Sequence, residues 1–80
     1  MDDQEVVDRI NQLAAEEHEL YERAAESGLS PVEKERLTTL GISLDQAWDL
    51  LHQRRARRRA GMDPDEATVR DPTTVEGYVD

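Results

Sequence analysis

Five arginines within six consecutive positions are the side chains of this chain with the clearest chemical capacity: Arg54, Arg55, Arg57, Arg58 and Arg59. A guanidinium group binds phosphate or carboxylate through paired hydrogen bonds, so this run could contact nucleic acid or an acidic protein surface. The chain has a net charge of -9, and no aromatic residue is interleaved among the arginines for base stacking. We therefore expect a protein partner for the arginine run, with nucleic acid or a nucleoprotein as the alternative.

Glutamates and two histidines raise the possibility of a metal site. His18 and Glu22 are four residues apart, and Asp49 and His52 are three apart, so each pair shares one helix face. A di-metal site in a helical bundle needs Glu-x-x-His on two helices and further glutamates on facing ones. In a hairpin the two pairs would lie roughly 12–18 Å apart along the axis, at about 1.5 Å per residue. We expect no metal site and no cofactor.

Nucleophilic catalysis has no support in the sequence. The chain has no cysteine, and its serines and threonines have no histidine and acid at a matching level of the expected helices. It has no glycine-rich phosphate loop either. We expect no catalytic residue, and we expect that the protein is not an enzyme.

The spacing of apolar residues predicts two long helices, over about 3–27 and about 31–60. Both seams approach the 3.5-residue repeat of coiled coils. Gly28 can end the first helix in a left-handed conformation, and Ser30 with Glu33 forms a capping box around Pro31 at the start of the second. The residues expected in the core or in self-association are Ile10, Leu13, Leu20, Tyr21, Leu37, Leu40, Leu44, Trp48 and Leu51.

The expected fold is all-α: an antiparallel two-helix hairpin over residues 1–61, followed by an acidic tail over 62–80 that is flexible or docked. Two helices alone do not close a core, because their apolar faces are broader than one seam. We expect two hairpins to pair into a four-helix bundle, which makes the protein a homodimer. The alternative is a monomer whose tail covers the open face.

A turn at Gly28 also sets which residues of the two helices face each other. It places Ile10 opposite Trp48, which we interpret as an anchor of the core or of the dimer interface. Glu17 falls at a seam position, where a polar residue can fix register or oligomeric state. Its carboxylate either pairs with a cation of a partner hairpin or reaches solvent at the edge of the seam.

Charge is segregated along the chain. Residues 1–30 carry nine acids and two bases, residues 31–60 four acids and seven bases, and residues 61–80 six acids and one base. No apolar stretch is long enough to span a membrane, and the acidic N-terminus is unlike a signal peptide, so we expect a cytoplasmic protein that does not bind membranes. The arginines could instead serve within the molecule, pairing with acids of the first helix, namely Asp2, Asp3, Glu5 and Asp8.

Several segments together resemble a family of small actinobacterial proteins. They are Met1–Ile10, Glu16–Leu20, Leu44–Leu51, the arginine run, and the tail from Gly61 to Tyr78. The family is the one catalogued as domain of unknown function 2630. The resemblance implies a short, cytoplasmic, helical protein that stands alone, with no assigned activity, substrate or catalytic residue. It also implies that the tail belongs to the fold and docks on it, through Val75 and Tyr78.

Overall fold

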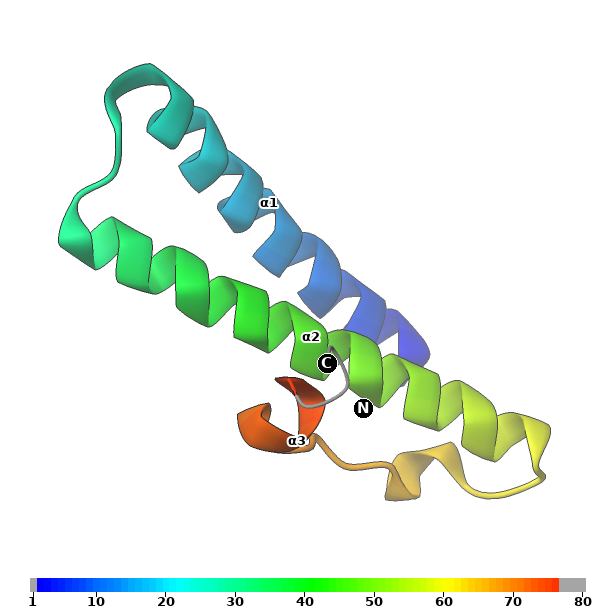
Figure 1. Cartoon of the computed structure of the whole chain (residues 1–80). Coiled ribbons are helices and arrows are strands. Elements are labelled where there is room, and N and C mark those ends of the chain that lie inside the picture. The colour runs from blue at the N-terminus through cyan, green and yellow to red at the C-terminus, as the bar shows by residue number, and fades with distance from the viewer. Residues whose placement is uncertain (1, 77–80) are drawn as a thin grey trace.

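The computed structural model describes residues 2–76, which form a helical hairpin with an appended tail. Helix α1 (Asp3–Ser27) and helix α2 (Pro31–Arg59) are its two antiparallel arms. The short 3-10 helix η1 (Pro64–Glu66) and helix α3 (Pro72–Glu76) run back along α2, on its side away from α1 (Figure 1). There is no strand among these residues, so the expected all-α class is confirmed.

The ends of the two long helices are fixed by local hydrogen bonds. The Asp2 carboxylate accepts from the Glu5 amide at 2.8 Å at the start of α1. Gly28 ends α1 with φ of 81°, a left-handed conformation that glycine adopts without strain. At the start of α2, the Ser30 hydroxyl accepts from the Glu33 amide and the Glu33 carboxylate accepts from the Ser30 amide, at 3.2 and 3.0 Å. The expected capping box is therefore present.

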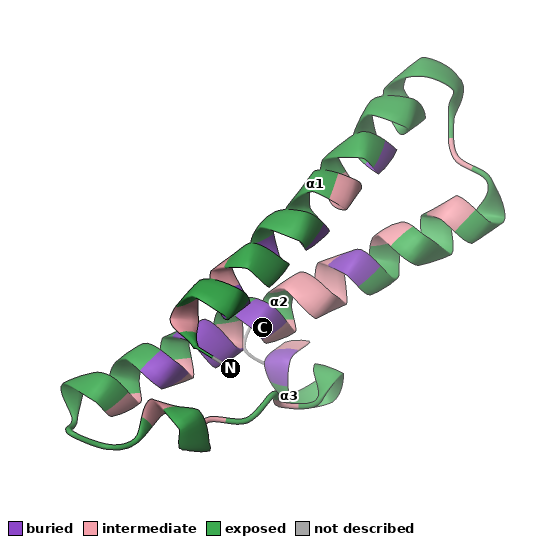
Figure 2. Ribbon diagram, turned by 180° about the vertical axis from the view of Figure 1, so that it is seen from behind, coloured by how far each residue is buried: buried purple, intermediate pink, exposed green. Residues whose placement is uncertain are grey.

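The core is a double cluster of aliphatic side chains on the facing sides of α1 and α2 (Figure 2). Leu40 and Leu51 are the most enclosed, with 0% and 1% of their surface exposed. One cluster lies near the open end of the hairpin, and the other lies nearer the turn. The first contains Val6, Ile10, Ala47, Leu50 and Leu51, and the second Leu13, Leu20 and Leu40.

Two residues expected in the core or in self-association lie outside the core of the single chain. Trp48 is 44% exposed and Tyr21 is 56% exposed. Each directly follows a buried residue, and one helical step turns a side chain by about 100°. Ile10 packs in the cluster that contains Ala47 and Leu51, so the side chain in the core at this level is that of Ala47, one position before the expected Trp48. Leu37 and Leu44 are half-buried against the core.

The described part of the tail is docked. Val75 is only 5% exposed, and α3 packs against α2. Two glutamine side chains of α2 hold the segment that leads to α3. Gln46 Nε2 donates to the Arg70 carbonyl at 3.0 Å, and Gln53 Nε2 donates to the Thr68 carbonyl at 2.8 Å. Tyr78, the second expected docking residue, lies outside the described residues.

Within residues 2–76, no helix is both long enough and apolar enough to cross a bilayer. Dimerisation is a property of two chains and stays a prediction.

Candidate interaction surface

Arg54 is the most buried charged side chain of the described residues, with 5% of the side chain exposed. Its Nε donates to Asp3 Oδ1 of α1 at 2.7 Å, and its Nη1 donates to Asp65 Oδ1 of η1 at 3.0 Å. The same Nη1 lies 3.3 Å from the Pro64 carbonyl oxygen, which also accepts from it. One guanidinium group thus joins the start of α1, the end of α2 and the tail.

Two further arginines are used inside the molecule. Arg58 Nη1 donates to Asp3 Oδ2 at 2.6 Å, so two guanidinium groups share one carboxylate. Hydrogen bonds from Arg58 and then Arg54 hold the pKa of Asp3 far below its ordinary value. Arg57 Nη1 lies 3.5 Å from Glu66 Oε2 of η1. We call this set of ion pairs the clasp, because it fastens the N-terminal end of α1 and the tail to the end of α2.

The other two arginines of the run, Arg55 and Arg59, are exposed. Neither has a hydrogen-bond or ion-pair partner within the described residues. They lie four residues apart and continue a line of exposed side chains that begins with Trp48 and His52. The spacing of four, three and four residues places these side chains along one side of α2. We call the line of Trp48, His52, Arg55 and Arg59 the α2 stripe.

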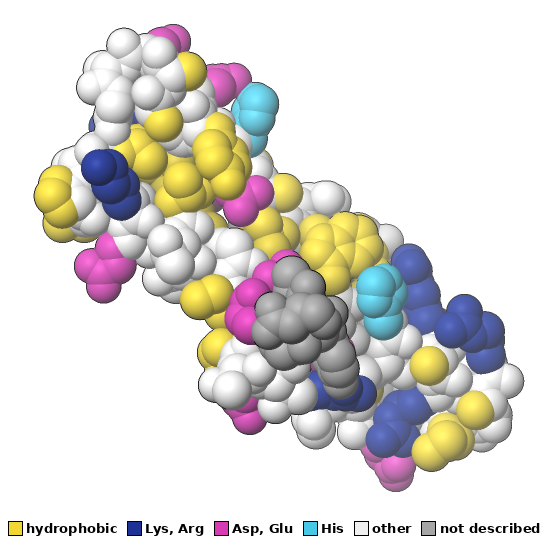
Figure 3. Space-filling view, in the orientation of Figure 1, with side chains coloured by type: hydrophobic (Ala, Val, Ile, Leu, Met, Phe, Trp, Pro, Cys, Tyr) yellow, Lys and Arg dark blue, Asp and Glu magenta, His cyan; other side chains and the backbone are white. Residues whose placement is uncertain are grey.

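The α2 stripe has an aromatic end and a basic end. The Trp48 and His52 rings are 6.0 Å apart between centroids and tilted by 38°. Figure 3 shows hydrophobic side chains, a histidine and then Lys or Arg side chains following one another toward the end of α2. No acid of the described residues neutralises the two arginines, so the stripe presents two free guanidinium groups on the same side of α2 as the Trp48 ring.

The histidines and acids considered for a metal site lie apart. His18 Nε2 pairs with Glu22 Oε1 at 2.8 Å on the exposed surface of α1. Asp49 accepts from Gln53 at 2.8 Å, and its carboxylate is 3.5 Å from the Arg70 guanidinium. Within residues 2–76, no three histidine or acidic side chains are grouped so that they could hold a metal ion.

Two acidic side chains, Asp45 of α2 and Glu76 of α3, lie together where α3 meets α2. A hydrogen bond between the Glu76 and Asp45 carboxyl groups, together with burial, raises the pKa of Glu76. Both border an open hollow of about 390 Å³ whose wall also includes Glu17 and Tyr21. Glu17 is half-buried and faces this hollow, and the described residues give it no cation.

The residues that organise the tail were missed at the level of sequence. Gln46 and Gln53 are seven residues apart and therefore share one side of α2, but glutamines at that spacing are usual on solvated helices. Asp65 follows Asp63 and Pro64, a pattern that indicates a turn and not a contact to a distant arginine. The one usable signal was charge, because acids of α1 and of the tail had to lie near the basic end of α2.

Comparison with known proteins gives a family without an assigned activity. The family model described as "Protein of unknown function (DUF2630)" matches residues 2–80. An uncharacterized protein of Mycobacterium bovis and another of Mycobacterium tuberculosis are each 47% identical over 77 residues, covering 95% of this chain and 88% of theirs. No solved structure gives a significant match. The chain therefore belongs to the DUF2630 family of proteins of unknown function.

Proposed function

We propose that this protein is a non-enzymatic interaction module that binds an acidic protein segment with the α2 stripe. The observation that carries the proposal is a half-exposed tryptophan, Trp48, on the same side of α2 as two arginines without partners. Tryptophan and arginine are the side chains most often found at the energetic centres of protein interfaces. A free guanidinium group also binds carboxylates with paired, directional hydrogen bonds.

The clasp narrows the surface that a partner can use. Arg54, Arg57 and Arg58 already bind acids of their own chain, and a partner would have to displace Asp3, Asp65 or Glu66 to reach them. Arg55 and Arg59 need no such exchange. The proposed contact is therefore the stripe, and not the whole arginine run.

Nucleic-acid binding is the weaker candidate. Affinity for nucleic acid grows with the number of phosphates that are neutralised, and two free arginines neutralise few. The net charge of -9 also repels a polyanion. A mobility shift at low salt that disappears in the Arg55→Ala/Arg59→Ala variant would favour this candidate over a protein partner.

Self-association would use the apolar part of the same flank. Trp48 and Tyr21 are exposed, and Leu44 and Val7 are only partly buried. Two hairpins packed through these side chains would form the expected four-helix bundle, with Arg55 and Arg59 at its edge. Light scattering across protein concentration tests this. A mass near twice 9.1 kDa that falls in Trp48→Ala supports the homodimer, and a constant monomer mass rejects it.

The test of the proposed function is quantitative capture from a mycobacterial extract. The immobilised protein is compared with Arg55→Ala/Arg59→Ala and with Trp48→Ala, and Lys34→Ala is the control because Lys34 is an exposed cation remote from the stripe. We expect the stripe variants to retain bound partners at roughly one tenth of the wild-type level, as is usual for the loss of interface hot spots. The captured proteins should be acidic and should elute with salt. An unchanged partner set in both stripe variants would reject the proposal.

A further inference from the structure

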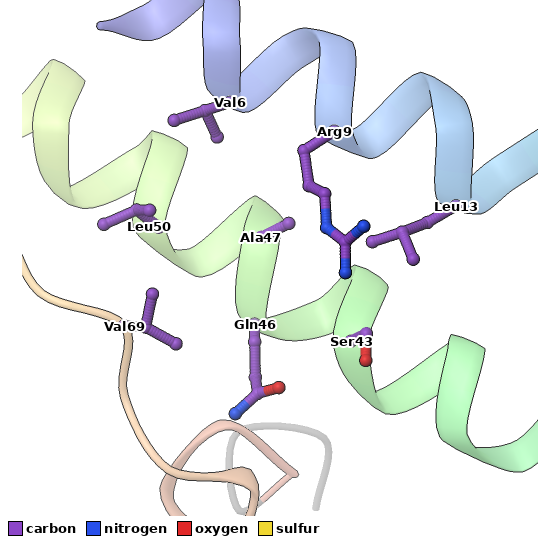
Figure 4. Close-up of a pocket in the computed structure, with 8 residues that line it drawn as sticks. All are labelled: Val6, Arg9, Leu13, Ser43, Gln46, Ala47, Leu50 and Val69. Atoms are coloured by element: carbon purple, nitrogen blue, oxygen red, sulfur yellow. The ribbon is translucent and has the colours of Figure 1, made fainter. Parts of the chain in front are cut away.

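A hollow of about 250 Å³ lies between α1 and α2 (Figure 4). Its lining residues Ser43, Gln46 and Leu50 are on the side of α2 away from Trp48, at about 100° per residue. Its floor consists of Val6, Leu13, Ala47 and Leu50, all of which are buried core residues. Val69 of the tail forms its outer wall and is 60% exposed. The hollow is thus an apolar depression, and a bound molecule would bury more of the exposed Val69 side chain that forms its outer wall.

The mouth of the hollow is polar and carries one positive charge. Figure 4 shows the Arg9 side chain extending from α1 toward Ser43 on α2, with Gln46 on the same helix. Arg9 has no hydrogen-bond or ion-pair partner among residues 2–76. Both oxygens of the nearby Glu16 accept from Arg36, at 2.5 and 2.9 Å, and these hydrogen bonds are the main cause of the lowered pKa of Glu16, to which the charge of Arg9 adds least.

We propose that this hollow binds a free medium-chain carboxylate, with the alkyl chain against the apolar floor and the carboxylate on Arg9. At about 30 Å³ per small molecular group, the volume suits a chain of roughly eight carbons. A single guanidinium group matches a single negative charge. The strongly acidic protein disfavours a doubly charged headgroup such as a phosphate monoester.

The docked tail is part of the proposed site. Gln46 holds the Arg70 carbonyl and Gln53 holds the Thr68 carbonyl, so Val69 is fixed between two anchored residues. This anchoring places the Val69 side chain at the hollow through contacts of the protein's own residues. A preformed wall lowers the ordering cost of binding.

The experiment uses the full chain and octanoate as the probe, followed by methyl resonances in NMR. Titration should shift the methyl groups of Val6, Leu13, Leu50 and Val69 together. Arg9→Gln should weaken octanoate binding roughly tenfold, the usual loss for one charge-assisted hydrogen-bonded contact, and should leave binding of uncharged octanol unchanged. Val69→Ala should weaken both probes, because both use the apolar wall. Both changes are at exposed positions, so both variants should fold.

The controls separate this site from the α2 stripe. Arg55→Gln removes an exposed arginine without a partner, as Arg9→Gln does, and should leave octanoate binding unchanged. Acetate carries the charge without the chain and should leave the floor methyl groups unshifted. Equal octanoate affinity in wild type and Arg9→Gln would overturn the assignment of the carboxylate to Arg9. Absence of methyl shifts at millimolar octanoate would overturn the site as a whole.

Discussion

Shortening Val75 should release the tail from α2 without unfolding the hairpin. Val75 is 5% exposed and is the buried residue of α3, which has only five residues. A helix this short does not form by itself in water, because the conformational entropy lost in ordering its first turn exceeds the stabilisation from its few hydrogen bonds. The helical state of Pro72–Glu76 therefore depends on docking, and docking depends on the apolar contact of Val75.

The size of the effect follows from the atoms removed. Val75→Ala deletes two methyl groups from a buried position, and burial stabilises by about 0.8 kcal/mol for each such group. The free energy of docking the tail on α2 should become less favourable by about 1.5 kcal/mol, which is roughly a tenfold change in the docking equilibrium. Because α3 packs against α2 and against no other helix among residues 2–76, the loss should appear as local opening and not as global unfolding.

Amide hydrogen exchange measured by NMR tests this prediction. The amides at positions 74 and 75 donate to the side chain and the carbonyl of Asp71, at 2.8 and 3.1 Å, and should exchange roughly tenfold faster in Val75→Ala. Amides of Ile10 and Leu51 in the core should keep their rates. Val32→Ala is the matched control, because Val32 is 75% exposed. Equal exchange at positions 74 and 75 in wild type and variant would refute the reasoning, as would equal acceleration in the core.

Three further predictions concern the hairpin itself. Leu40→Ala should lower the free energy of unfolding in urea by about 2–5 kcal/mol, because Leu40 is 0% exposed, and a loss below about 1 kcal/mol would contradict that burial. Gly41→Ala should raise stability by about 0.5–1 kcal/mol, because the added Cβ meets only Glu17 Oε2, at 3.9 Å. Gly28→Ala should lower stability by about 1–3 kcal/mol, because φ of 81° with ψ of 172° is a conformation that almost only glycine adopts. Shifts of the melting temperature in the same direction for Gly41→Ala and Gly28→Ala would refute these two predictions. Asp3 has a pKa lowered in the folded state, so its stabilising effect is present above about pH 4 and is lost on acidification; Asp3→Asn should flatten the acid side of the stability profile measured by urea unfolding.

The hairpin could be predicted from sequence because its signals are local and agree with one another. The capping box at Ser30 and Glu33, the break at Gly28 and the two aliphatic seams each indicate the same two helices. It was harder to predict which side chains of α2 face α1. A seam read at 3.5 residues per repeat drifts against the 3.6 residues of a straight helix, and an error of one position moves Trp48 from the interface to the flank.

The family resemblance implied that the tail docks through Val75, but the other contacts that hold the tail could not be read from the sequence, for a different reason. The described tail has no helical or strand periodicity, and it is held by two glutamine amides, one valine and ion pairs to α2. Glutamine side chains occur mostly on solvated surfaces, so Gln46 and Gln53 carry no signal until the backbone of Thr68–Arg70 is placed beside them. The hollow that Val69 borders results from the same placement of the tail, so it could not be predicted from the sequence either.

The arginine run shows why charge counted along a helix differs from charge presented to a partner. Five arginines in six positions are spread over about 200° of the circumference of α2, since each step turns by about 100°. Acids elsewhere in the fold pair with three of them. Asp3 binds Arg54 and Arg58, and acids of η1 bind Arg54 and Arg57. The two that remain lie on the flank that also exposes Trp48. The free basic surface is therefore set by the acids of α1 and of the tail as much as by the arginines, and removing Glu66 should enlarge it by releasing Arg57, whereas Arg54 stays bound to Asp3.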